Sequence, residues 1–509
     1  MFKKRNIESK MMSNSYLIEH LKNKFPNAKI GMCHGVFDVL HSGHIYHFKQ
    51  ASSLVDVLIV SITSDRFVNK GPSRPINTLS DRMATIAGIE YIDFVIESDF
   101  SSSENNINLI QPNLYFKGDD YRGDSQDKNI DYAGNLNAET VALNKYGGEI
   151  YFTSEPVMSS SSIINEMKNV SPEEKITTDH LKSFFSKRPL TDLIKEIKEK
   201  RILLIGEVIL DEYIFTESLG KSGKHPLVAE KEISRKQFLG GIVPLIDTFA
   251  SFLKPKNLTV ASVHSSEIIF KNYNFINQII LDHNYTEIKK TRYVNDKTNT
   301  FLFETYQMDD QYIANRNEQI LLNILTKSVN EVDMLIALDF GHGLITPNMR
   351  SLMSNNYKNF AVNVQKNAGN KGFSSISKYS SAGLVVLNGD EVELELKQKG
   401  IDKFEAAVEI RKIMSAEIVV ITDGSNGLII TNGERVVHVP ALFGGKIVDR
   451  TGAGDSVFAM ISLFSLVVDD LEVLGYLGNI AGAMNLNWFA NEKSISEQDL
   501  INAVHFGLK

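Results

Sequence analysis

The fold of the first part of the chain is decided by one stretch, KIGMCHGVFDVLHSGH, at positions 29–44. Its apolar run from Ile30 to Met32 breaks at Gly35, and it ends in His41-Ser-Gly-His44 before a helical pattern over residues 45–55. A strand that enters a helix through a glycine-containing turn forms an anion site, because free N–H groups and the positive end of the helix dipole converge there. The two histidines add side-chain donors, so the stretch predicts a site for phosphate chemistry.

Apolar runs alternate with helical patterns through the first half of the chain. Strands are expected at 30–32, 57–62, 94–96, 114–116 and 150–152, with helices between them, including 80–89 and 138–146. This alternation predicts an α/β fold with a parallel, doubly wound sheet, whose ligands lie beyond the C-terminal ends of the strands. The histidine stretch follows the first strand, where that rule places a site.

Three further clusters are expected at the same edge of the sheet. The loop from Lys70 to Pro75, KGPSRP, is basic and rich in turn residues, and Arg82 follows it in a helix. The segment KGDDY at 117–121 follows the strand at 114–116, and the serine run at 159–162 reads as a helix start with its cap. Each cluster alone is typical of an ordinary loop. Their common position favours a phosphate site.

Residues 29–168 resemble the nucleotidyltransferase family that includes glycerol-3-phosphate cytidylyltransferase, and also the adenylyltransferase half of bacterial bifunctional heptose kinase/adenylyltransferases. The signatures that carry the resemblance are the segment 35–44, the segment 117–121 and the serine run before Ile163. The resemblance implies that His41 and His44 act on the triphosphate. It also implies nucleotide or phosphate contacts from Gly35, Phe37, Asp38, Lys70, Arg74, Arg82, Lys117, Gly118, Asp119, Asp120, Ser160, Ser161, Ser162 and Ile163.

The implied chemistry needs no protein nucleophile. The phosphate of an acceptor attacks the α-phosphorus of a nucleoside triphosphate in line, and pyrophosphate leaves, so catalysis comes from positioning and from hydrogen-bond donors. The base stays open: the loop 70–75 with Arg82 resembles adenylyltransferases and favours ATP, whereas the double aspartate at 119–120 resembles cytidylyltransferases and favours CTP. CTP is slightly preferred.

A second signature, DRTGAGDSVFA at 449–459, follows further alternation of strands and helices. Strands are expected at 201–206, 334–338, 360–364, 383–387, 418–421 and 427–430. A Gly-Ala-Gly sequence before a helix offers successive backbone N–H groups to an anion. Asp455 at the helix start is well placed to take a proton from a hydroxyl that attacks a γ-phosphate.

Residues 200–509 resemble the ribokinase-like sugar kinases. Asp455 matches their catalytic base, and Asn388-Gly-Asp-Glu391 matches a motif associated with magnesium and phosphate, so Glu391 is the expected metal residue. The resemblance implies nucleotide contacts from Asn388, Glu391, Thr422, Gly424, Gly427, Gly452, Ala453 and Gly454, and sugar contacts from Asp211, Gly240 and Gly241. The combination resembles the bifunctional heptose enzymes with their halves in reversed order.

Several positions depart from these families. Ile242-Val-Pro244 follows the glycine pair where relatives carry small residues and a sugar-binding asparagine, and His342 stands where the heptose kinases carry lysine. The acceptor part of the kinase site is therefore expected to be altered, or its activity reduced. His34 has no assigned role, and residues 122–136 are either a specificity insertion or a surface loop.

Composition limits the class of protein. The chain has 509 residues, a net charge of −8 and one cysteine, which argues against general nucleic-acid binding and fits a reducing cytoplasm. Its longest apolar run, 457–468, is too short to span a bilayer, so no membrane partner is expected. The expected division is an N-terminal extension (1–28), a transferase domain (29–168), a linker (169–199) and a kinase domain (200–509).

Together these features predict a cytoplasmic nucleotidyltransferase that activates a sugar or polyol phosphate for surface polysaccharide synthesis. Its substrates would be CTP or ATP, its cofactor Mg²⁺, and its state a homodimer, as relatives of both halves imply. One alternative is a bifunctional enzyme that phosphorylates heptose 7-phosphate and then adenylylates the product. Another is a protein whose kinase half binds nucleotide only as a scaffold for dimerisation.

Overall fold

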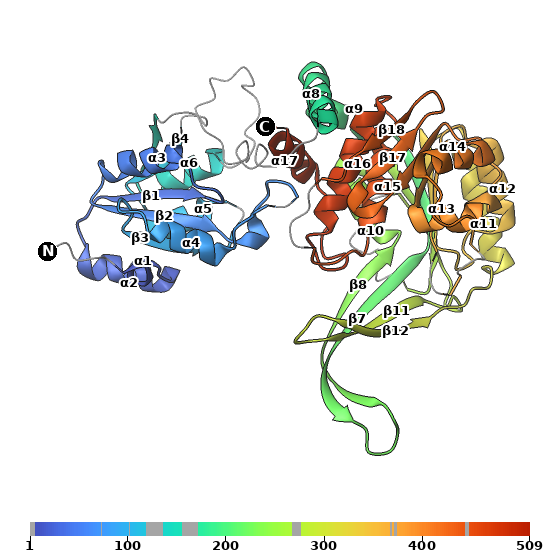
Figure 1. Ribbon diagram of the computed structural model, residues 1–509, viewed down its shortest axis with the longest axis horizontal. Helices are drawn as coiled ribbons and strands as arrows, with labels where there is room; N and C mark the ends of the chain where they lie inside the picture. The colour runs from blue at the N-terminus through green and yellow to red at the C-terminus, as the bar shows by residue number, and fades with distance from the viewer. Residues whose placement is uncertain are drawn as a thin grey trace. The chain divides into compact units, whose positions relative to one another are not determined.

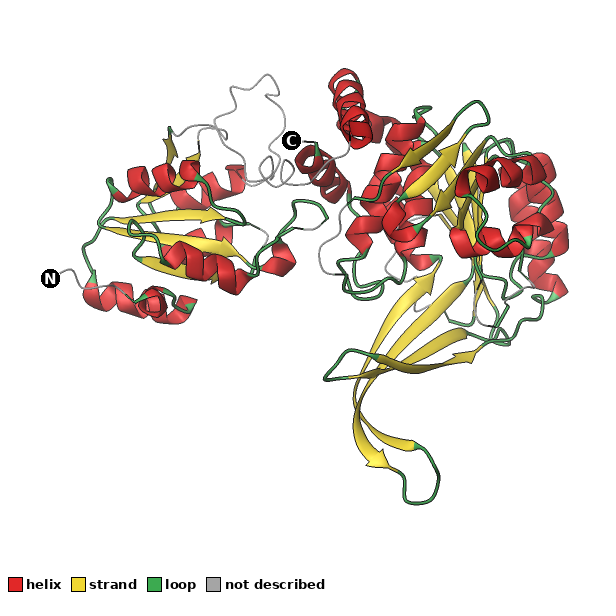
Figure 2. Cartoon of the chain, viewed as in Figure 1, coloured by secondary structure: helices red, strands yellow, loops and turns green. Residues whose placement is uncertain are grey.

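The computed structural model describes residues 6–72, 74–100, 102–118, 136–154, 172–266, 276–366, 369–370, 374–442 and 447–508. The chain divides into two compact units, one formed by residues 1–172 with 502–509 and the other by residues 173–501. Each unit has its own sheet with helices around it (Figures 1 and 2). The α/β class expected from the sequence is confirmed in both.

The sheet of the first unit has five parallel strands in the order β3-β2-β1-β4-β5. Its strands are β1 (Ile30–Gly35), β2 (Val57–Thr63), β3 (Phe94–Ser98), β4 (Leu114–Gly118) and β5 (Glu149–Thr153). Its helices are α1 (Ile7–Lys10), α2 (Asn14–Lys24), α3 (Ser42–Ser52), α4 (Leu79–Ala87), α5 (Glu104–Ile110) and α6 (Leu136–Asn144).

Two apolar layers cover the two faces of this sheet, because successive side chains of a strand point to opposite faces. Met32 of β1 packs in one layer with residues of α2, α5 and α6. Its neighbour Cys33 packs in the other layer with residues of α3 and α4. From β1, the chain adds β2 and β3 on one side of the sheet and then β4 and β5 on the other side. The C-terminal ends of β1 and β4 therefore mark the switch point, where doubly wound sheets bind ligands.

Residues 11–28, expected to belong to an N-terminal extension, pack onto this unit. Leu17 and Leu21 of α2 are buried in the layer that contains Met32, and Met11 forms a parallel bridge with Val95 of β3. The sequence prediction missed this because α2 is polar apart from a short apolar stripe, which becomes informative only once the sheet is known.

The second unit is built on a nine-stranded sheet in the order β10-β9-β6-β13-β14-β15-β16-β17-β18. Strands up to β16 are parallel to their neighbours, and β17 and β18 are antiparallel. The strands are β6 (Ile202–Gly206), β9 (Leu258–His264), β10 (Ile276–Leu281), β13 (Met334–Asp339), β14 (Phe360–Val364), β15 (Leu384–Asn388), β16 (Ile418–Thr422), β17 (Leu428–Thr431) and β18 (Val436–Val439).

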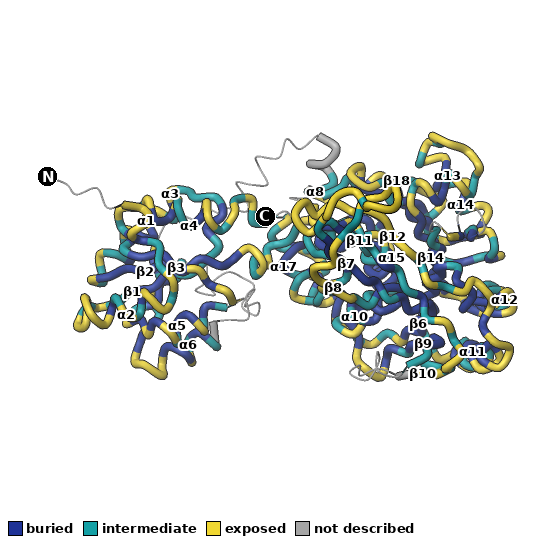
Figure 3. The backbone as a smooth tube through the Cα atoms, turned by 90° about the horizontal axis from the view of Figure 1, so that it is seen from below, coloured by how far each residue is buried: buried dark blue, intermediate teal, exposed yellow. Residues whose placement is uncertain are grey.

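Helices surround this sheet, and buried residues concentrate along its strands (Figure 3). The helices are α8 (Pro172–Lys187), α9 (Leu190–Lys198), α10 (Val243–Phe252), α11 (Asn315–Ser328), α12 (Pro347–Asn356), α13 (Gly389–Leu396), α14 (Lys403–Met414), α15 (Ala453–Phe464), α16 (Leu471–Asn485) and α17 (Glu497–Gly507). The expected linker is thus largely helical, and α9 buries Leu193, Ile194 and Ile197. Across the described residues, no helix combines the length and apolar character needed to cross a membrane.

A separate four-stranded sheet, here called the lid, has the order β12-β11-β7-β8. It consists of β7 (Val208–Lys221), β8 (Val228–Gly241), β11 (Ile288–Asn295) and β12 (Phe301–Gln307). The β7–β8 hairpin projects far from the nine-stranded sheet (Figure 1). β7 directly follows β6 in sequence, so the lid begins at the C-terminal edge of the large sheet.

Candidate active sites

The first site is built where β1 leads into α3. Phe37 has a left-handed backbone conformation (φ 50°), and α3 starts at Ser42 with His41 as its N-cap. The rings of His41 and His44 stack with their centroids 3.9 Å apart, and the Phe37 ring lies edge-on to His44 at 5.4 Å. The structure thus brings both predicted histidines together at a helix N-terminus, where backbone N–H groups attract anions.

The pKa values of both histidines are lowered, which favours their neutral forms. Burial, followed by the charges of His41, His47 and Lys70, lowers the pKa of His44 to about 3. Burial also lowers the pKa of His41. Because His44 Nδ1 accepts a hydrogen bond from the His41 backbone N–H (3.4 Å), its neutral ring carries the proton on Nε2 and can donate it to a phosphate oxygen. Among the described residues, the buried His41 Nδ1 has no hydrogen-bond partner.

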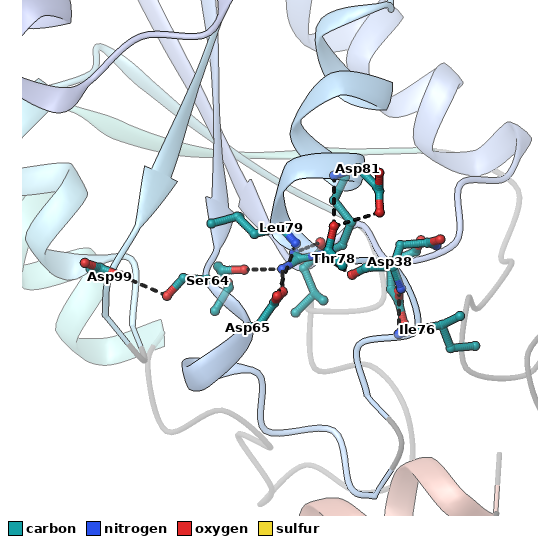
Figure 4. Close-up of polar contacts among 12 residues, drawn as sticks. Asp38, Ser64, Asp65, Ile76, Thr78, Leu79, Asp81 and Asp99 are labelled. Carbon is teal, nitrogen blue, oxygen red and sulfur yellow. Dashed lines mark hydrogen bonds and ion pairs between the residues drawn. The ribbon is translucent and has the colours of Figure 1, made fainter. Parts of the chain in front are cut away.

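The carboxylate of Asp38, expected to bind nucleotide, is engaged within the protein. Its oxygens accept hydrogen bonds from the backbone N–H groups of Ile76 (2.8 and 2.9 Å) and Asn77 (2.9 Å) (Figure 4). Asn77 Nδ2 donates in return to the Asp38 carbonyl (2.5 Å). Asp38 therefore ties the turn after β1 to the loop that carries Lys70 and Arg74, and it influences the site through that loop.

Arg82 also has a framework position instead of the expected phosphate contact. Its side chain is buried, with 1% of the residue exposed. Its guanidinium donates to the carbonyls of Asn77 (3.1 Å), Val36 (2.6 Å) and Thr63 (2.9 Å), and to Asp65 Oδ1 (2.5 Å). Arg82 thus joins the turn after β1, the end of β2 and the loop before α4.

Three weaker contacts complete this framework (Figure 4). Thr78 caps α4 by accepting from the Asp81 N–H (3.3 Å), and the Leu79 N–H donates to Asp65 (3.2 Å). Ser64 Oγ donates to Asp99 (3.0 Å). The loop beyond β2 is consequently held at both ends, which fixes the basic segment between them.

Lys70 is the cation that this loop brings toward the histidines. It lies close enough to His44 for its charge to lower the pKa of that ring. Arg74 is half-buried near Asp38; burial lowers the pKa of Arg74, and the charge of Asp38 raises it. Of the three basic residues predicted from this part of the sequence, Lys70 therefore accompanies the histidine pair.

Lys117 and Gly118 end β4, on the other side of the switch point. Lys117 Nζ forms an ion pair with Glu139 Oε2 of α6 (2.5 Å). Burial, followed by the charge of Lys117, lowers the pKa of His34 to about 4. The His34 ring contacts the hydroxyls of Ser61 (3.2 Å) and Thr63 (3.3 Å), so both its nitrogens are used within the protein.

The remaining nucleotide-binding residues predicted for the first unit lie outside the described residues. They are Asp119, Asp120, Ser160, Ser161, Ser162 and Ile163.

The second site is centred on the turn that starts α15. Asp449 Oδ1 accepts from the backbone N–H groups of Arg450 (2.6 Å) and Thr451 (3.0 Å), and from the Thr451 hydroxyl (3.0 Å). Gly452 follows with φ 80°, a conformation that favours glycine, and is the N-cap of α15. Asp455 lies in the first turn of that helix, so the carboxylate and the helix N-terminus belong to one site.

Half of the predicted kinase residues line one cavity of about 190 Å³. Its lining includes Asn388, Glu391, Thr422, Gly452, Gly454 and Asp455, together with Asn363, Gln365, Lys366, Val386 and Leu387. Gly424 and Gly427 instead shape the turn between β16 and β17, with φ 55° and 94°. A Cβ at Gly427 would collide with the backbone of Val439, which explains the glycine.

Asp455 carries a strongly perturbed carboxyl group. Its pKa is raised to about 7: burial and the charges of Glu391 and Asp211 raise it, while a hydrogen bond from Gln365 and the charge of Lys290 oppose them. Gln365 Nε2 donates to Asp455 Oδ1. A carboxylate whose pKa lies near neutrality can both take up and release a proton under ordinary conditions, as a general base must.

Glu391 occupies a structural position that does not fit a direct metal ligand. Its Oε2 accepts from the Asn388 N–H (2.9 Å), and Asn388 Oδ1 accepts from the Glu391 N–H (2.8 Å), which forms a capping box at the start of α13. Glu391 Oε1 accepts from the Lys366 N–H (3.3 Å). Within the described residues, the only group of three potential ligands close together is His180, Asp470 and Glu472, outside both sites.

The acceptor end of the second site combines Asp211 with two cations of the lid. A Cβ at Gly240 would collide with Asp211 Oδ2, and one at Gly241 (φ 65°) with the carbonyl of Glu207, so the predicted glycine pair allows close packing here. Arg292 of β11 pairs with Asp211 Oδ1 (2.5 Å). Lys290, two residues earlier on the same strand, is largely buried; burial lowers its pKa, and Asp211 and Asp455 raise it.

The residues that sequence reasoning missed are Gln365, Lys366, Lys290 and Arg292. Gln365 and Lys366 follow β14, and the C-terminal end of a parallel strand was the signal that could have found them. Lys290 and Arg292 lie on a lid strand with no alternating apolar pattern, KKTR at 289–292, and no sequence signal pointed to them.

The two positions that depart from the kinase family also have defined places in the structure. Pro244 lies in the first turn of α10, and the buried His342 ring contacts Asp310 (2.9 Å).

Comparison with known proteins agrees with this division. Residues 32–167 match the family described as cytidylyltransferase-like, and residues 285–487 match the pfkB family of carbohydrate kinases. These two stretches follow one another in the chain, with the cytidylyltransferase-like match first. The bifunctional protein HldE of Campylobacter concisus is 38% identical over 120 residues, 23% of this chain and 25% of that protein. HldE of Vibrio cholerae is 35% identical over 162 residues, 31% of this chain and 32% of that protein.

These matches therefore span between a quarter and a third of each of these two curated relatives. Among solved structures, phosphofructokinase-2 from Escherichia coli in complex with potassium has a TM-score of 0.48 and 15% identity, covering 61% of this chain and all of that one. Ribokinase from Thermotoga maritima has a TM-score of 0.45 and 15% identity, covering 60% of this chain and 99% of that one.

Proposed function

We propose that the first unit transfers a nucleotidyl group from a nucleoside triphosphate to a sugar or polyol phosphate, with release of pyrophosphate. The stacked pair of His41 and His44 at the N-terminus of α3 carries this proposal. The N–H groups of the helix start and the Nε2–H of His44 can stabilise the charge that develops on the transferring phosphoryl group, and Lys70 adds a positive charge beside them. No protein nucleophile and no protein-bound metal is required; Mg²⁺ would enter with the triphosphate.

CTP is the proposed nucleotide, with ATP as the alternative. The description of the matching family and the KGDDY pattern at 117–121 support CTP. The product, a nucleotide-activated sugar or polyol, is of the chemical kind from which surface polysaccharides are assembled. The test is pyrophosphate release with CTP, ATP, GTP and UTP, each against a panel of sugar and polyol phosphates.

The histidines can be tested in the same assay. His44→Ala should lower turnover about 100-fold or more, because removal of one such donor typically costs 10²–10³ in rate, and His41→Ala should do likewise. His20→Ala, in the remote helix α2, is the matched control and should retain activity. Full pyrophosphate release by the His41 or His44 variant would contradict the assignment, and no release with any substrate pair would contradict the transferase function itself.

For the second unit we propose ATP-dependent phosphoryl transfer to an acceptor that differs from the usual heptose. The cavity that contains Asp455 supports nucleotide binding, and the helix start at Gly452 offers N–H groups to the transferred phosphate. Lys290 and Arg292 favour a negatively charged acceptor, because both cations lie at its end of the site.

An ATP-consumption screen over sugars and sugar phosphates tests this proposal. Asp455→Asn should abolish any activity found, since the amide cannot accept the proton of the attacking hydroxyl. Activity with heptose 7-phosphate would support the bifunctional heptose alternative. Nucleotide binding without turnover on any acceptor would instead support the scaffold alternative.

A further inference from the structure

The acceptor end of the second site lacks the polar side chain that the resemblance places after the glycine pair, because Pro244 lies there at the start of α10. We propose that Asn491, from the segment after α16, binds hydroxyl groups of the acceptor in its place. This inference rests on the proposed kinase function and assigns it a specificity-determining residue.

Asn491 lies between the two glycine positions that shape the site. A Cβ built on Gly240 would lie 3.4 Å from Asn491 Nδ2 and would collide with Asp211 Oδ2. A Cβ built on Gly452 would lie 2.8 Å from Asn491 Oδ1. The carboxamide therefore reaches from Asp211, whose carboxylate is expected to hold sugar hydroxyls, to the start of α15, which is expected to hold the transferred phosphate. The acceptor hydroxyl and this phosphate must meet during the reaction.

The hydrogen bonds of this carboxamide are poorly satisfied. Asn491 Oδ1 is buried and, within the described part of the chain, has no hydrogen-bond partner. Nδ2 makes one long contact, 3.4 Å to the carbonyl of Leu239. A buried polar atom without a partner is unfavourable, and two hydroxyl groups of a ligand would supply the missing partners.

The backbone that carries Asn491 is held in an unusual conformation. Ala490 has φ 49°, in the left-handed region that a residue with a Cβ rarely adopts. Its N–H donates to Asp449 Oδ2 (3.0 Å), while Oδ1 of the same carboxylate shapes the turn before Gly452. One carboxylate thus positions both Asn491 and the anion-binding turn, as expected where local strain serves a site.

The segment is also fixed from the side of the lid. Phe489 packs against Tyr213 with ring centroids 4.7 Å apart and against Phe238 at 5.9 Å. Tyr213 and Phe238 belong to β7 and β8, the same strands that carry Asp211 and Gly240 at the site. Asn491 is therefore held between the lid and α15, and is positioned before any ligand arrives.

The chemistry of the pair defines the ligand. Arg292 occupies Asp211 Oδ1, which leaves Oδ2 to accept a hydrogen bond from one hydroxyl. Asn491 Nδ2 can donate to the oxygen of that hydroxyl, and Oδ1 can accept from its neighbour. This pattern selects a vicinal diol, as found in sugars and sugar phosphates, over an acceptor with a single hydroxyl.

The full-length protein offers a probe for this test, because Trp488 is its only tryptophan and lies three residues from Asn491. Its fluorescence should report binding of D-fructose, D-mannose, their 6-phosphates and sedoheptulose 7-phosphate in the presence of a non-hydrolysable ATP analogue. Asn491→Leu, of similar shape but without hydrogen-bonding groups, should weaken the binding of whichever compound binds by about 10-fold or more. Nucleotide affinity should not change.

Asn487→Leu in the same segment is the matched control, since its side chain bonds only the Ala483 carbonyl (3.3 Å) among the described residues, and it should bind like the wild type. A deoxy analogue that lacks one hydroxyl of the diol should bind the wild type and Asn491→Leu equally. Unchanged affinity in Asn491→Leu would overturn the inference, and so would failure of the wild type to bind any of these compounds. Neither result bears on pyrophosphate release by the first unit.

Discussion

At the scale of single residues, Asp455 and Gln365 determine how the second site responds to pH. The Asp455 carboxyl group is buried near Glu391 and Asp211, and both burial and these charges favour its protonated form. The Gln365 amide donates to Oδ1 and so stabilises the ionised form, which is the form that can accept a proton. Gln365 is therefore a positioning residue that keeps the base ionised and oriented.

Removing this amide should move the pH profile. Phosphoryl transfer by the wild type should rise as the pH passes through about 7, where Asp455 loses its proton. Gln365→Leu should shift this rise to higher pH by about one unit, because a hydrogen bond to a charged group contributes about 1.5–3 kcal/mol and one pKa unit equals about 1.4 kcal/mol. The measurement is kcat against pH. A uniform loss of rate at every pH would mean that Gln365 only supports the fold.

Sequence reasoning at this scale placed the reactive groups but not their partners. The pair of His41 and His44 could be predicted because both lie in one helical turn, so their proximity follows from local structure alone. Asp38, Arg82 and Glu391 were expected to face ligands, yet each is engaged within the protein. The partners of Asp38 and Arg82 lie up to 46 residues away in sequence, so only the folded chain reveals them.

At the scale of elements, the loop between β2 and α4 depends on Arg82. This guanidinium is buried and donates to three backbone carbonyls, those of Val36, Thr63 and Asn77, and to Asp65. Its replacement would leave buried acceptors without partners, which is among the more costly single changes in a protein core.

Arg82→Met should therefore destabilise the first unit by about 3 kcal/mol, measured as a fall in the free energy of unfolding in denaturant. Arg66→Met is the matched control, because Arg66 pairs with Asp99 at the surface, where such ion pairs contribute little. Because Arg82 holds the loop that carries Lys70, a stabilised Arg82 variant should still release pyrophosphate more slowly. Equal stability of the two variants would contradict the framework role.

Most strands of the two large sheets were predicted from the sequence, whereas β9, β10, β18, the lid and helices α1 and α2 were not. Buried parallel strands are continuous apolar runs, as in β2 and β13, and such runs are visible in a single sequence. The outer half of the β7–β8 hairpin and β12 are exposed, with charged residues among apolar ones. Without a buried face, these strands show no alternation of apolar and polar residues that a sequence pattern could detect.

At the scale of the whole molecule, the described residues of each candidate site belong to a single unit. His41, His44 and Lys70 belong to the first unit, and Asp211 and Asp455 to the second. No described residue of one predicted site is needed to complete the other. The two reactions should therefore be separable by single substitutions in the intact chain.

His44→Ala should nearly abolish pyrophosphate release while leaving ATP consumption by the second unit within about twofold of the wild type, because the substitution removes one donor and no packing contact outside the first unit. Asp455→Asn should have the opposite effect, with ATP consumption lost and pyrophosphate release retained. Both activities should be measured on the same preparations, with each acceptor supplied separately and then together. Loss of both activities in either variant would show that the sites depend on each other. If the kinase product is the acceptor of the transferase, then one acceptor should give pyrophosphate release with the wild type but not with Asp455→Asn. That result would place the kinase step first.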